Sequence, residues 1–184
     1  KVGQIYVYPG NSGMKSTPKV ILIDEMSEEN LIKYILNLSL TFVIIGPENI
    51  IQSGIGEKLK KMGLNVLAPT PEAAQLETSK IFSKKIMLMS DIPTAKYFAV
   101  YSLNEAYKVL NYFPQDQGIV IKLSGLHAGK GVVVCENKNE AVEVLRNFSE
   151  QISNGVVIEE KLVGKEVSLF YLCLEKASIY FGEA

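Results

Sequence analysis

Gly118 to Cys135 reads Gly-Ile-Val-Ile-Lys-Leu-Ser-Gly-Leu-His-Ala-Gly-Lys-Gly-Val-Val-Val-Cys. Two runs of β-branched residues, 119–121 and 132–134, favour packed strands. Between them lie a serine and three glycines, residue types that form tight turns and leave the backbone bare. The stretch therefore predicts a strand, a glycine loop and a second strand, around which the rest of the chain is organised.

Two lysines, Lys122 and Lys130, bracket the turn of this hairpin. Bare backbone amides and ammonium groups together suit a phosphate. The stretch is not a Walker A loop, because the spacer between Gly125 and Gly129 is too short, Gly131 follows Lys130, and a strand comes next instead of a helix. Two interpretations remain: a glycine hairpin that folds over a nucleotide, or an ordinary β-hairpin with a lysine in its turn.

The composition is that of a globular protein. Hydrophobic residues make up 47% and charged residues 21% of the 184 residues, which argues against disorder. With 19 basic and 20 acidic residues the net charge is −1, which gives no support for a nucleic-acid partner or an anionic membrane. No apolar run approaches the roughly 20 residues that a membrane helix needs. We therefore expect no nucleic-acid or membrane partner.

The two cysteines, Cys135 and Cys173, both lie in predicted strands and have no partner at metal-ligand spacing. We expect both to be buried free thiols in a reducing compartment, and a cytoplasmic location follows. The chain begins Lys1-Val2-Gly3, which is neither an initiator methionine nor the start of a signal peptide. With strands expected at both ends, we predict that the chain is a piece of a longer protein.

The first half alternates short strands with amphipathic helices. Strands are expected at 4–8, 20–23, 41–45 and 65–67, and helices from Ser27 to Leu38 and from Ile50 to Met62. This alternation predicts a parallel sheet with helices on its faces. Ligands of such sheets bind at the loops that follow the strands, here 9–13 and 46–48, although each loop read singly could be a plain turn.

Pro69-Thr70-Pro71 ends this pattern, and we place a domain boundary near residue 78. The second half predicts a mixed, largely antiparallel fold. Its expected helices are 72–78, 79–89, 139–147 and one capped by Ser102; its expected strands, besides the glycine hairpin, are 96–100, 156–159, 166–174 and 177–181.

Two further features of the second half could serve a nucleotide. Lys84, on a predicted helix, could point at the same phosphates as Lys122 and Lys130. The stretch 157–166 reads as a strand that stops, crosses over and restarts, which would free backbone groups to bind the edge of adenine. Glu166 could accept hydrogen bonds from ribose hydroxyls, or be a solvated acid.

Taken in order, these motifs resemble the ATP-grasp ligases, and the whole chain resembles the glycinamide ribonucleotide synthetases, also called phosphoribosylamine–glycine ligases. The resemblance rests on the order and spacing of motifs that are individually weak. They are Pro9-Gly10-Asn11-Ser12-Gly13, Gly46-Pro47-Glu48, Pro69-Thr70, Ala73-Ala74-Gln75-Leu76-Glu77, Ser79-Lys80, Ile92-Pro93-Thr94-Ala95, Gly125-Leu126-His127-Ala128-Gly129-Lys130-Gly131-Val132, and Val157-Ile158-Glu159-Glu160 followed by Gly164.

The resemblance implies an α/β fold in two domains: a parallel, Rossmann-like preATP-grasp sheet in 1–78, lacking its first strand, and the front part of an ATP-grasp α+β domain in 79–184. It also implies roles for individual residues. ATP phosphates would be held by Lys84 and Lys122 under a loop containing Leu126, Ala128, Gly129, Lys130 and Gly131. Adenine would meet the backbone of Glu159, Glu160, Lys161 and Leu162, and the ribose would be held by Glu166. Phosphoribosylamine would face Pro9, Gly10, Asn11, Gly13, Gly46, Pro47 and Glu48.

By the same resemblance, the parent protein would use ATP to join glycine to 5-phosphoribosylamine in purine biosynthesis. Glycyl phosphate would be the intermediate, and ADP and phosphate would be released. No side chain of this chain is expected to be a nucleophile, and the Mg²⁺ ligands are expected beyond Ala184, so the 184 residues should be inactive alone. The resemblance leaves open whether the parent is fused to other purine-pathway enzymes.

Two positions depart from the family pattern: His127 stands where Ala is usual, and Ala68 stands where Gly is usual. His127 is the one histidine of the chain, and we interpret it as a tolerated loop residue. Two alternatives to the proposed activity remain: another ATP-grasp carboxylate–amine ligase, and a nucleotide-binding module without catalysis.

Overall fold

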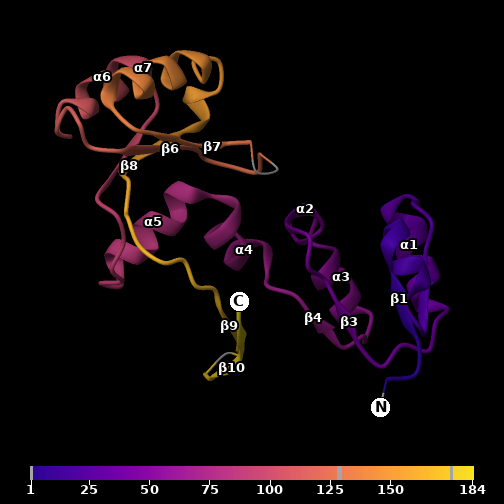
Figure 1. The fold of residues 1–184 in the computed structure, drawn as a ribbon. Helices are drawn as coiled ribbons and strands as arrows, with labels where there is room; N and C mark the ends of the chain where they lie inside the picture. The colour runs from indigo at the N-terminus through magenta and orange to yellow at the C-terminus, as the bar shows by residue number, and fades with distance from the viewer. Residues whose placement is uncertain (1, 128–129, 175) are drawn as a thin grey trace. The chain divides into compact units, whose positions relative to one another are not determined.

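The computed structural model describes residues 2–127, 130–174 and 176–184, which form two compact units (Figure 1). The division falls between Ala74 and Gln75. Each unit has a hydrophobic core of its own, so each is described by itself.

The first unit contains parallel strands, as its alternating pattern predicted, but they form two pairs instead of the one continuous sheet that was expected. Strand β1 pairs in parallel with β2, and β3 pairs in parallel with β4, as two separate two-stranded sheets. In chain order the elements are β1 (Ile5–Val7), the 3-10 helix η1 (Ser12–Ser16), β2 (Val20–Leu22), α1 (Glu28–Leu36), β3 (Val43–Ile44), α2 (Glu48–Gln52), α3 (Ile55–Lys61) and β4 (Val66–Leu67).

The core of the first unit is built from two helices with the same spacing of apolar residues. Leu31 and Ile35 of α1 meet Ile55 and Leu59 of α3, each pair being one helical turn apart. Helix α1 begins where predicted, because the Ser27 hydroxyl accepts a hydrogen bond from the Asn30 amide at 3.4 Å. Val43 of β3 and Val66 of β4 pack on this cluster, and so does Tyr8, the residue that follows β1.

The single helix expected from Ile50 to Met62 is wrong, because the chain forms α2 and α3 with a break between them. Gly54 lies at the break with a φ of 74°, a left-handed conformation that interrupts a right-handed helix. The apolar periodicity continues across the break, which is why the pattern alone suggested one helix.

The second unit is built on a four-stranded sheet in the order β5-β8-β6-β7, with every neighbouring pair antiparallel. The glycine hairpin is confirmed as β6 and β7. In chain order the elements are α4 (Pro71–Thr78, crossing from the first unit), α5 (Lys80–Met89), β5 (Tyr97–Val100), α6 (Leu103–Leu110), β6 (Ile119–Leu123), β7 (Val132–Cys135), α7 (Lys138–Asn147), the 3-10 helix η2 (Ile152–Asn154), β8 (Val156–Glu160), β9 (Leu169–Cys173) and β10 (Ser178–Glu183).

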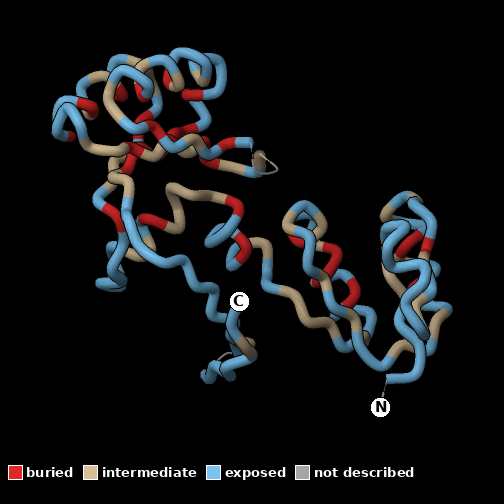
Figure 2. Tube along the Cα trace, in the orientation of Figure 1, coloured by how far each residue is buried: buried red, intermediate tan, exposed pale blue. Residues whose placement is uncertain are grey.

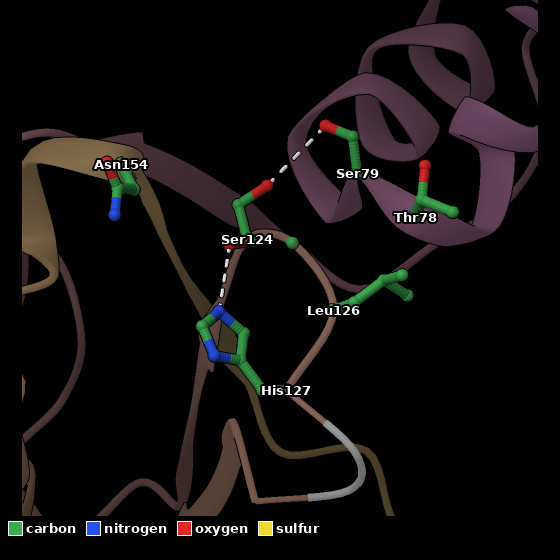
Figure 3. Close-up of a pocket in the computed structure, with 7 residues that line it drawn as sticks. Thr78, Ser79, Ser124, Leu126, His127 and Asn154 are labelled. Atoms are coloured by element: carbon green, nitrogen blue, oxygen red, sulfur yellow. Dashed lines mark hydrogen bonds between the residues drawn. The ribbon is translucent and has the colours of Figure 1, made fainter. Parts of the chain in front are cut away.

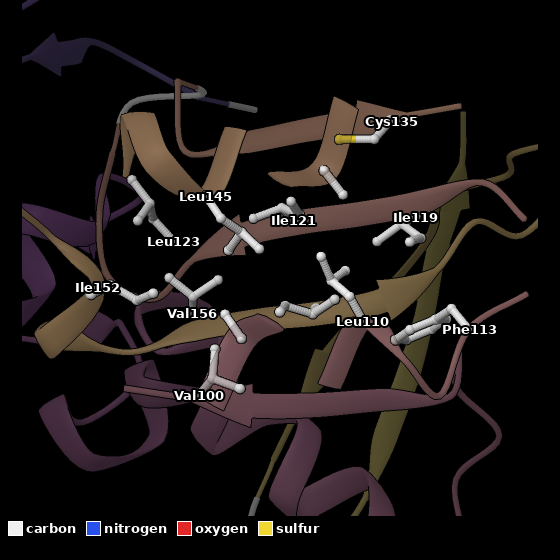
Figure 4. Packing of buried hydrophobic residues seen from close by; sticks show 13 residues of the cluster. Val100, Leu110, Phe113, Ile119, Ile121, Leu123, Cys135, Leu145, Ile152 and Val156 are labelled. Atoms are coloured by element: carbon white, nitrogen blue, oxygen red, sulfur yellow. The ribbon is translucent and has the colours of Figure 1, made fainter. Parts of the chain in front are cut away.

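The alternation along β6 decides which side chains reach which face of this sheet. Ile119, Ile121 and Leu123 are buried in the core formed with α6 and α7 (Figure 4). Lys122, between them, points to the opposite face, where α5 packs against β8. One face of the sheet therefore forms the hydrophobic core, and the other face carries the charged side chain of Lys122.

Burial is distributed accordingly (Figure 2), with buried residues concentrated in this sheet and the helices α6 and α7 that cover it. Cys135 at the end of β7 is buried as predicted, and burial, with smaller contributions from Glu140 and Glu136, raises the pKa of its thiol to about 11. The thiol therefore stays protonated at neutral pH and behaves as a small apolar core residue.

The strands β9 and β10 form an antiparallel hairpin whose residues are largely exposed (Figure 2). Two expectations fail here. Cys173 is exposed and not buried, because β9 pairs only with β10 in the part of the chain that the structure describes. The strand expected from Glu166 begins instead at Leu169, which leaves Glu166 in an exposed segment without regular structure.

Among the described helices, none has both the length and the apolar character needed to cross a membrane.

The packing of β6 predicts a stability difference between two aliphatic truncations in the same hairpin. Ile121→Ala removes a side chain that is 0% exposed, whereas Val134→Ala on β7 removes one that is 51% exposed. We expect Ile121→Ala to lower the free energy of unfolding by about 2–5 kcal/mol, because it leaves a cavity between β6 and the helices, and Val134→Ala to cost about 1 kcal/mol or less. Urea unfolding followed by circular dichroism measures both, and equal losses would contradict this account of the core.

Candidate functional site

The glycine loop is fastened to the sheet at both of its ends. The Leu123 amide donates to the Gly131 carbonyl at 2.7 Å, and the Ser124 amide donates to the Gly155 carbonyl at 2.9 Å. Within the loop, the Lys130 amide donates to the His127 carbonyl at 2.9 Å, and Lys130 itself is exposed. The predicted loop residues Ala128 and Gly129 lie outside the described residues.

A buried carboxylate joins the two lysines that were expected to bind phosphate. Glu159 of β8 is 4% exposed; its Oε1 contacts the Lys122 ammonium, and its Oε2 lies 2.5 Å from the Lys84 Nζ. The contact between Lys84 Nζ and Glu159 Oε2 lacks hydrogen-bond geometry, so Oε2 is buried without a hydrogen-bond partner. The Coulombic attraction of the Lys84 ammonium compensates the cost of burying this charged oxygen. Lys84 also donates to Thr94 Oγ1 at 2.6 Å, which fixes its ammonium beside Glu159.

The sequence predicted a different use of Glu159, through its backbone. The structure places this residue inside β8, where it lies opposite Tyr97 on one side and Val120 on the other. Because β8 is a central strand, its main chain is occupied by the sheet. What Glu159 offers to the site is its side chain.

A third lysine, Lys80, lies on the same side of the sheet, and the sequence interpretation gave it no role. Its Nζ donates to the Gly125 carbonyl at 3.1 Å, which links the start of α5 to the glycine loop. Burial first, and repulsion from Lys122 second, lower the pKa of its ammonium. The signal was present in the sequence, because Lys80 and Lys84 are one helical turn apart and must share a face of α5.

These groups open into a cavity of about 500 Å³ between α5 and the sheet. Its lining combines the charged side chains Lys80, Lys84, Lys122 and Glu159 with apolar side chains; the apolar lining is Leu76, Met87, Pro93, Ala95, Val132, Val157 and Leu162. The ammonium groups outnumber the carboxylate, which leaves the cavity with a net positive charge. A cavity of this size with cations at one place and apolar walls elsewhere fits a polyphosphate attached to a planar base.

The crossover after β8 is held by the backbone of its first residues. The Glu160 amide donates to the Lys96 carbonyl at 3.0 Å, and the Lys161 amide donates to the Gly118 carbonyl at 2.9 Å. The Lys161 ammonium pairs with Glu136 at 2.7 Å. Leu162 is therefore the first residue beyond the sheet contacts, and it lines the cavity.

The structure thus brings four predicted nucleotide residues to one cavity, and it places others elsewhere. Lys84, Lys122, Glu159 and Leu162 line the cavity, and Gly131 ends the loop beside it. Other side chains, those of Lys130, Glu160, Lys161 and Glu166, are not part of its lining, and Leu126 lines a second cavity of about 410 Å³ beside the loop (Figure 3).

In the first unit, the two loops expected to face a substrate follow β1 and β3. Asn11 in the first loop is used locally, since its Oδ1 accepts from the Met14 amide at 3.2 Å and caps η1. Pro47 precedes α2, and Glu48 is the first residue of that helix. Both loops lie at the carboxyl ends of parallel strands, the usual position of ligand sites in such sheets.

Within 2–127, 130–174 and 176–184, no group of three or more histidine, cysteine, aspartate or glutamate side chains is arranged to hold a metal ion.

An antiparallel sheet with a glycine hairpin, facing lysines and a strand crossover defines a protein of the ATP-grasp class. Residues 78–184 match the family model of the phosphoribosylglycinamide synthetase ATP-grasp (A) domain, and residues 1–77 match that of the phosphoribosylglycinamide synthetase N domain. The chain belongs to the phosphoribosylglycinamide synthetase family.

Named relatives agree with this assignment. A phosphoribosylamine–glycine ligase of Chlorobaculum tepidum is 38% identical over 187 residues, which cover 94% of this chain and 42% of the relative. The human trifunctional purine biosynthetic protein adenosine-3 is 37% identical over 91% of this chain and 17% of its own length. The chain therefore spans about two fifths of the length of the single-function relatives that it matches.

Solved structures give the same fold. The phosphoribosylamine–glycine ligase of Thermotoga maritima superposes with a TM-score of 0.73 at 26% identity, covering 98% of this chain and 43% of that one. The D-alanine–D-alanine ligase of Helicobacter pylori, at 21% identity, a TM-score of 0.59 and coverage of 80% and 47%, shows likeness of fold alone. The expected α/β fold, with parallel strands followed by an ATP-grasp unit, is confirmed.

The repulsion between Lys80 and Lys122 predicts a measurable change in one pKa. Lys122→Met keeps the aliphatic chain and removes the charge, so the pKa of Lys80 should rise toward its ordinary value. Lys108→Met, on the exposed face of α6, is the matched control and should leave Lys80 unchanged. Competitive amine labelling of Lys80 as a function of pH, read by mass spectrometry, measures the shift; an unchanged or lowered pKa in Lys122→Met would contradict the arrangement.

Proposed function

We propose that this chain carries the nucleotide site of an ATP-dependent ligase that joins glycine to 5-phosphoribosylamine in purine biosynthesis. The observation that carries the proposal is the convergence of Lys80, Lys84 and Lys122 around Glu159 in one cavity. Membership of the phosphoribosylglycinamide synthetase family and the printed name of the relatives support the reaction.

ATP phosphates would lie against the ammonium groups, with the glycine loop beside them. Lys122 has a side chain that is 29% exposed, against 11% for Lys84, so Lys122 is the more accessible of the two. Lys84, which is held by Thr94 and Glu159, would contribute charge from a fixed position. By the family resemblance, the loop residues Leu126, Ala128, Gly129, Lys130 and Gly131 would also contact the phosphates.

Adenine would lie against the crossover after β8. Leu162 would contribute apolar surface and backbone groups, because the amides of Glu160 and Lys161 are already used within the protein. Glu166 lies in the exposed segment that follows, and it would accept hydrogen bonds from the ribose hydroxyls.

In the reaction, the glycine carboxylate attacks the γ-phosphorus of ATP, and ADP leaves. The amine of 5-phosphoribosylamine then attacks the carbonyl carbon of glycyl phosphate, loses a proton and expels phosphate, which forms the amide bond. The lysines stabilise the charge that the transferring phosphoryl group carries, so the protein works through position and electrostatics without a nucleophilic side chain. Mg²⁺ would accompany ATP, with ligands outside the described residues.

The two units would divide the work. Residues 1–78 would form the preATP-grasp domain, with Pro9, Gly10, Asn11, Gly13, Gly46, Pro47 and Glu48 facing phosphoribosylamine, and residues 79–184 would form the front part of the ATP-grasp domain. The partners would be small molecules, and the location would be cytoplasmic. The whole protein would be open to fusion with other purine enzymes, as the name of the human relative, a trifunctional purine biosynthetic protein, indicates for that protein.

An ATP titration tests the nucleotide site. Lys122→Ala should weaken ATP binding by roughly ten-fold or more, because a charge-assisted contact to phosphate is lost. Lys108→Ala, on α6, removes an equal charge outside the cavity and should leave the affinity within about two-fold. Isothermal titration calorimetry measures both; absence of saturable binding to the unmodified protein, or equal effects of the two substitutions, would refute the site.

A turnover assay tests the proposed division of activity. The 184 residues, given ATP, Mg²⁺, glycine and 5-phosphoribosylamine, should release no sustained phosphate, because they span about two fifths of the relatives' length. Full-length relatives assayed in parallel provide the positive control. Multiple turnovers by the 184 residues would show that the catalytic groups are all present here; binding of ATP without ligation in the whole parent protein would instead favour a nucleotide-binding module.

A further inference from the structure

The side chain of His127 lies against both ends of the glycine loop. Its Nε2 lies 3.1 Å from the carbonyl oxygen of Ser124, where the loop begins (Figure 3). At the other end the ring lies against Gly131: a Cβ added to that glycine would be 2.8 Å from His127 Cβ and 3.0 Å from its Cγ. The ring therefore fits only because residue 131 has no side chain.

The two ends that His127 joins are themselves attached to the sheet. Ser124 is 8% exposed, and its amide is bonded to the Gly155 carbonyl that precedes β8. The Gly131 carbonyl accepts from the Leu123 amide at the end of β6. The imidazole therefore spans the base of the loop between two residues that are bonded to the sheet. We call this pair of contacts of His127, with Ser124 and with Gly131, the brace.

The chemistry of the contact determines where the ring carries a proton. A carbonyl oxygen can only accept a hydrogen bond, so Nε2 must donate, and the neutral ring must be the Nε2–H tautomer. A nitrogen that donates in this way is not a free base. The geometry therefore gives Nε2 of His127 a role in holding the backbone.

We propose that His127 is a positioning residue of the nucleotide site, which holds the base of the glycine loop in the shape that receives phosphate. The inference rests on the proposed function. Its link to the cavity is Lys80, whose ammonium bonds to the Gly125 carbonyl, the residue next to Ser124. A displacement of Ser124 and Gly125 therefore moves the acceptor of a lysine that lines the cavity.

The brace reduces the conformational entropy that the glycine loop loses when a nucleotide binds. A loop whose base is already fixed loses less conformational entropy when phosphate binds, so the affinity for the nucleotide is higher. Loss of the contact should weaken ATP binding while the fold and the core of the second unit remain unchanged, since His127 is not among the residues of that core.

Three substitutions separate the hydrogen bond from the rest of the side chain. His127→Gln keeps an amide N–H at the position equivalent to Nε2, His127→Asn places its amide closer to the backbone and out of reach of Ser124, and His127→Ala removes both ring and donor. We expect His127→Asn and His127→Ala to weaken ATP binding about three- to ten-fold, and His127→Gln to stay within about two-fold of the unmodified protein. Equal affinities in all three variants, or a His127→Gln variant as weak as His127→Asn, would overturn the proposal.

A spectroscopic measurement tests the geometry without any nucleotide. His127 is the one histidine of the 184 residues, so a long-range ¹H–¹⁵N spectrum of the protein contains a single imidazole and needs no assignment. For the neutral ring, the spectrum should show the proton on Nε2. The Nδ1–H tautomer would overturn the brace even if ATP binds.

The two experiments distinguish failure of this inference from failure of the proposed function. If the unmodified protein binds ATP and the His127 variants bind equally well, only the brace is refuted. If the unmodified protein shows no saturable binding, the nucleotide site and the role of His127 in it fail together. Near-ultraviolet circular dichroism of each variant confirms that the comparison is made between folded proteins.

Discussion

The ion pairs of one buried carboxylate join α5 to strands β6 and β8 on the face of the sheet that lines the cavity. Glu159 lies on a central strand, Lys84 comes from α5, and Lys122 comes from the neighbouring strand β6. A buried carboxylate without partners would be severely destabilising, so α5 and β6 must both deliver their lysines to the same point. This requirement places a cavity between helix and sheet and gathers positive charge around it.

The sheet supports this arrangement by giving its two faces different tasks. Along β6, Ile119, Ile121 and Leu123 pack against α6 and α7, while Lys122 reaches the cavity. The apolar face provides the burial that stabilises the unit, and the rigid strands then fix the lysine and the carboxylate on the other face. The glycine loop continues from the same strand, so its backbone is positioned by the same core.

The loop itself is anchored more firmly than a glycine-rich sequence suggests. Its ends bond to the sheet, Lys80 donates to the Gly125 carbonyl, and His127 spans its base. Gly131 has no side chain, so the imidazole of His127 can lie against it. The same residue leads directly into β7. Glycine at position 131 permits the close approach of the imidazole, and the hydrogen bonds to the sheet hold the two ends of the loop.

The sequence by itself determined the local structure: β-branched runs made β6 and β7, Ser27 and Ser102 began their helices, and the alternation of strands and helices gave parallel pairs in the first unit. Predictions from the sequence were wrong in two places. Gly54 divides the expected single helix into two, and Cys173 is exposed because its strand has one described partner. Only the tertiary structure decided that the side chain of Glu159 joins Lys84 and Lys122; the spacing of Lys80 and Lys84 had already put those two lysines on one face of α5. The physical reason is that ion pairs between a strand and a helix depend on which faces meet, and residues far apart in sequence carry no local pattern that records it.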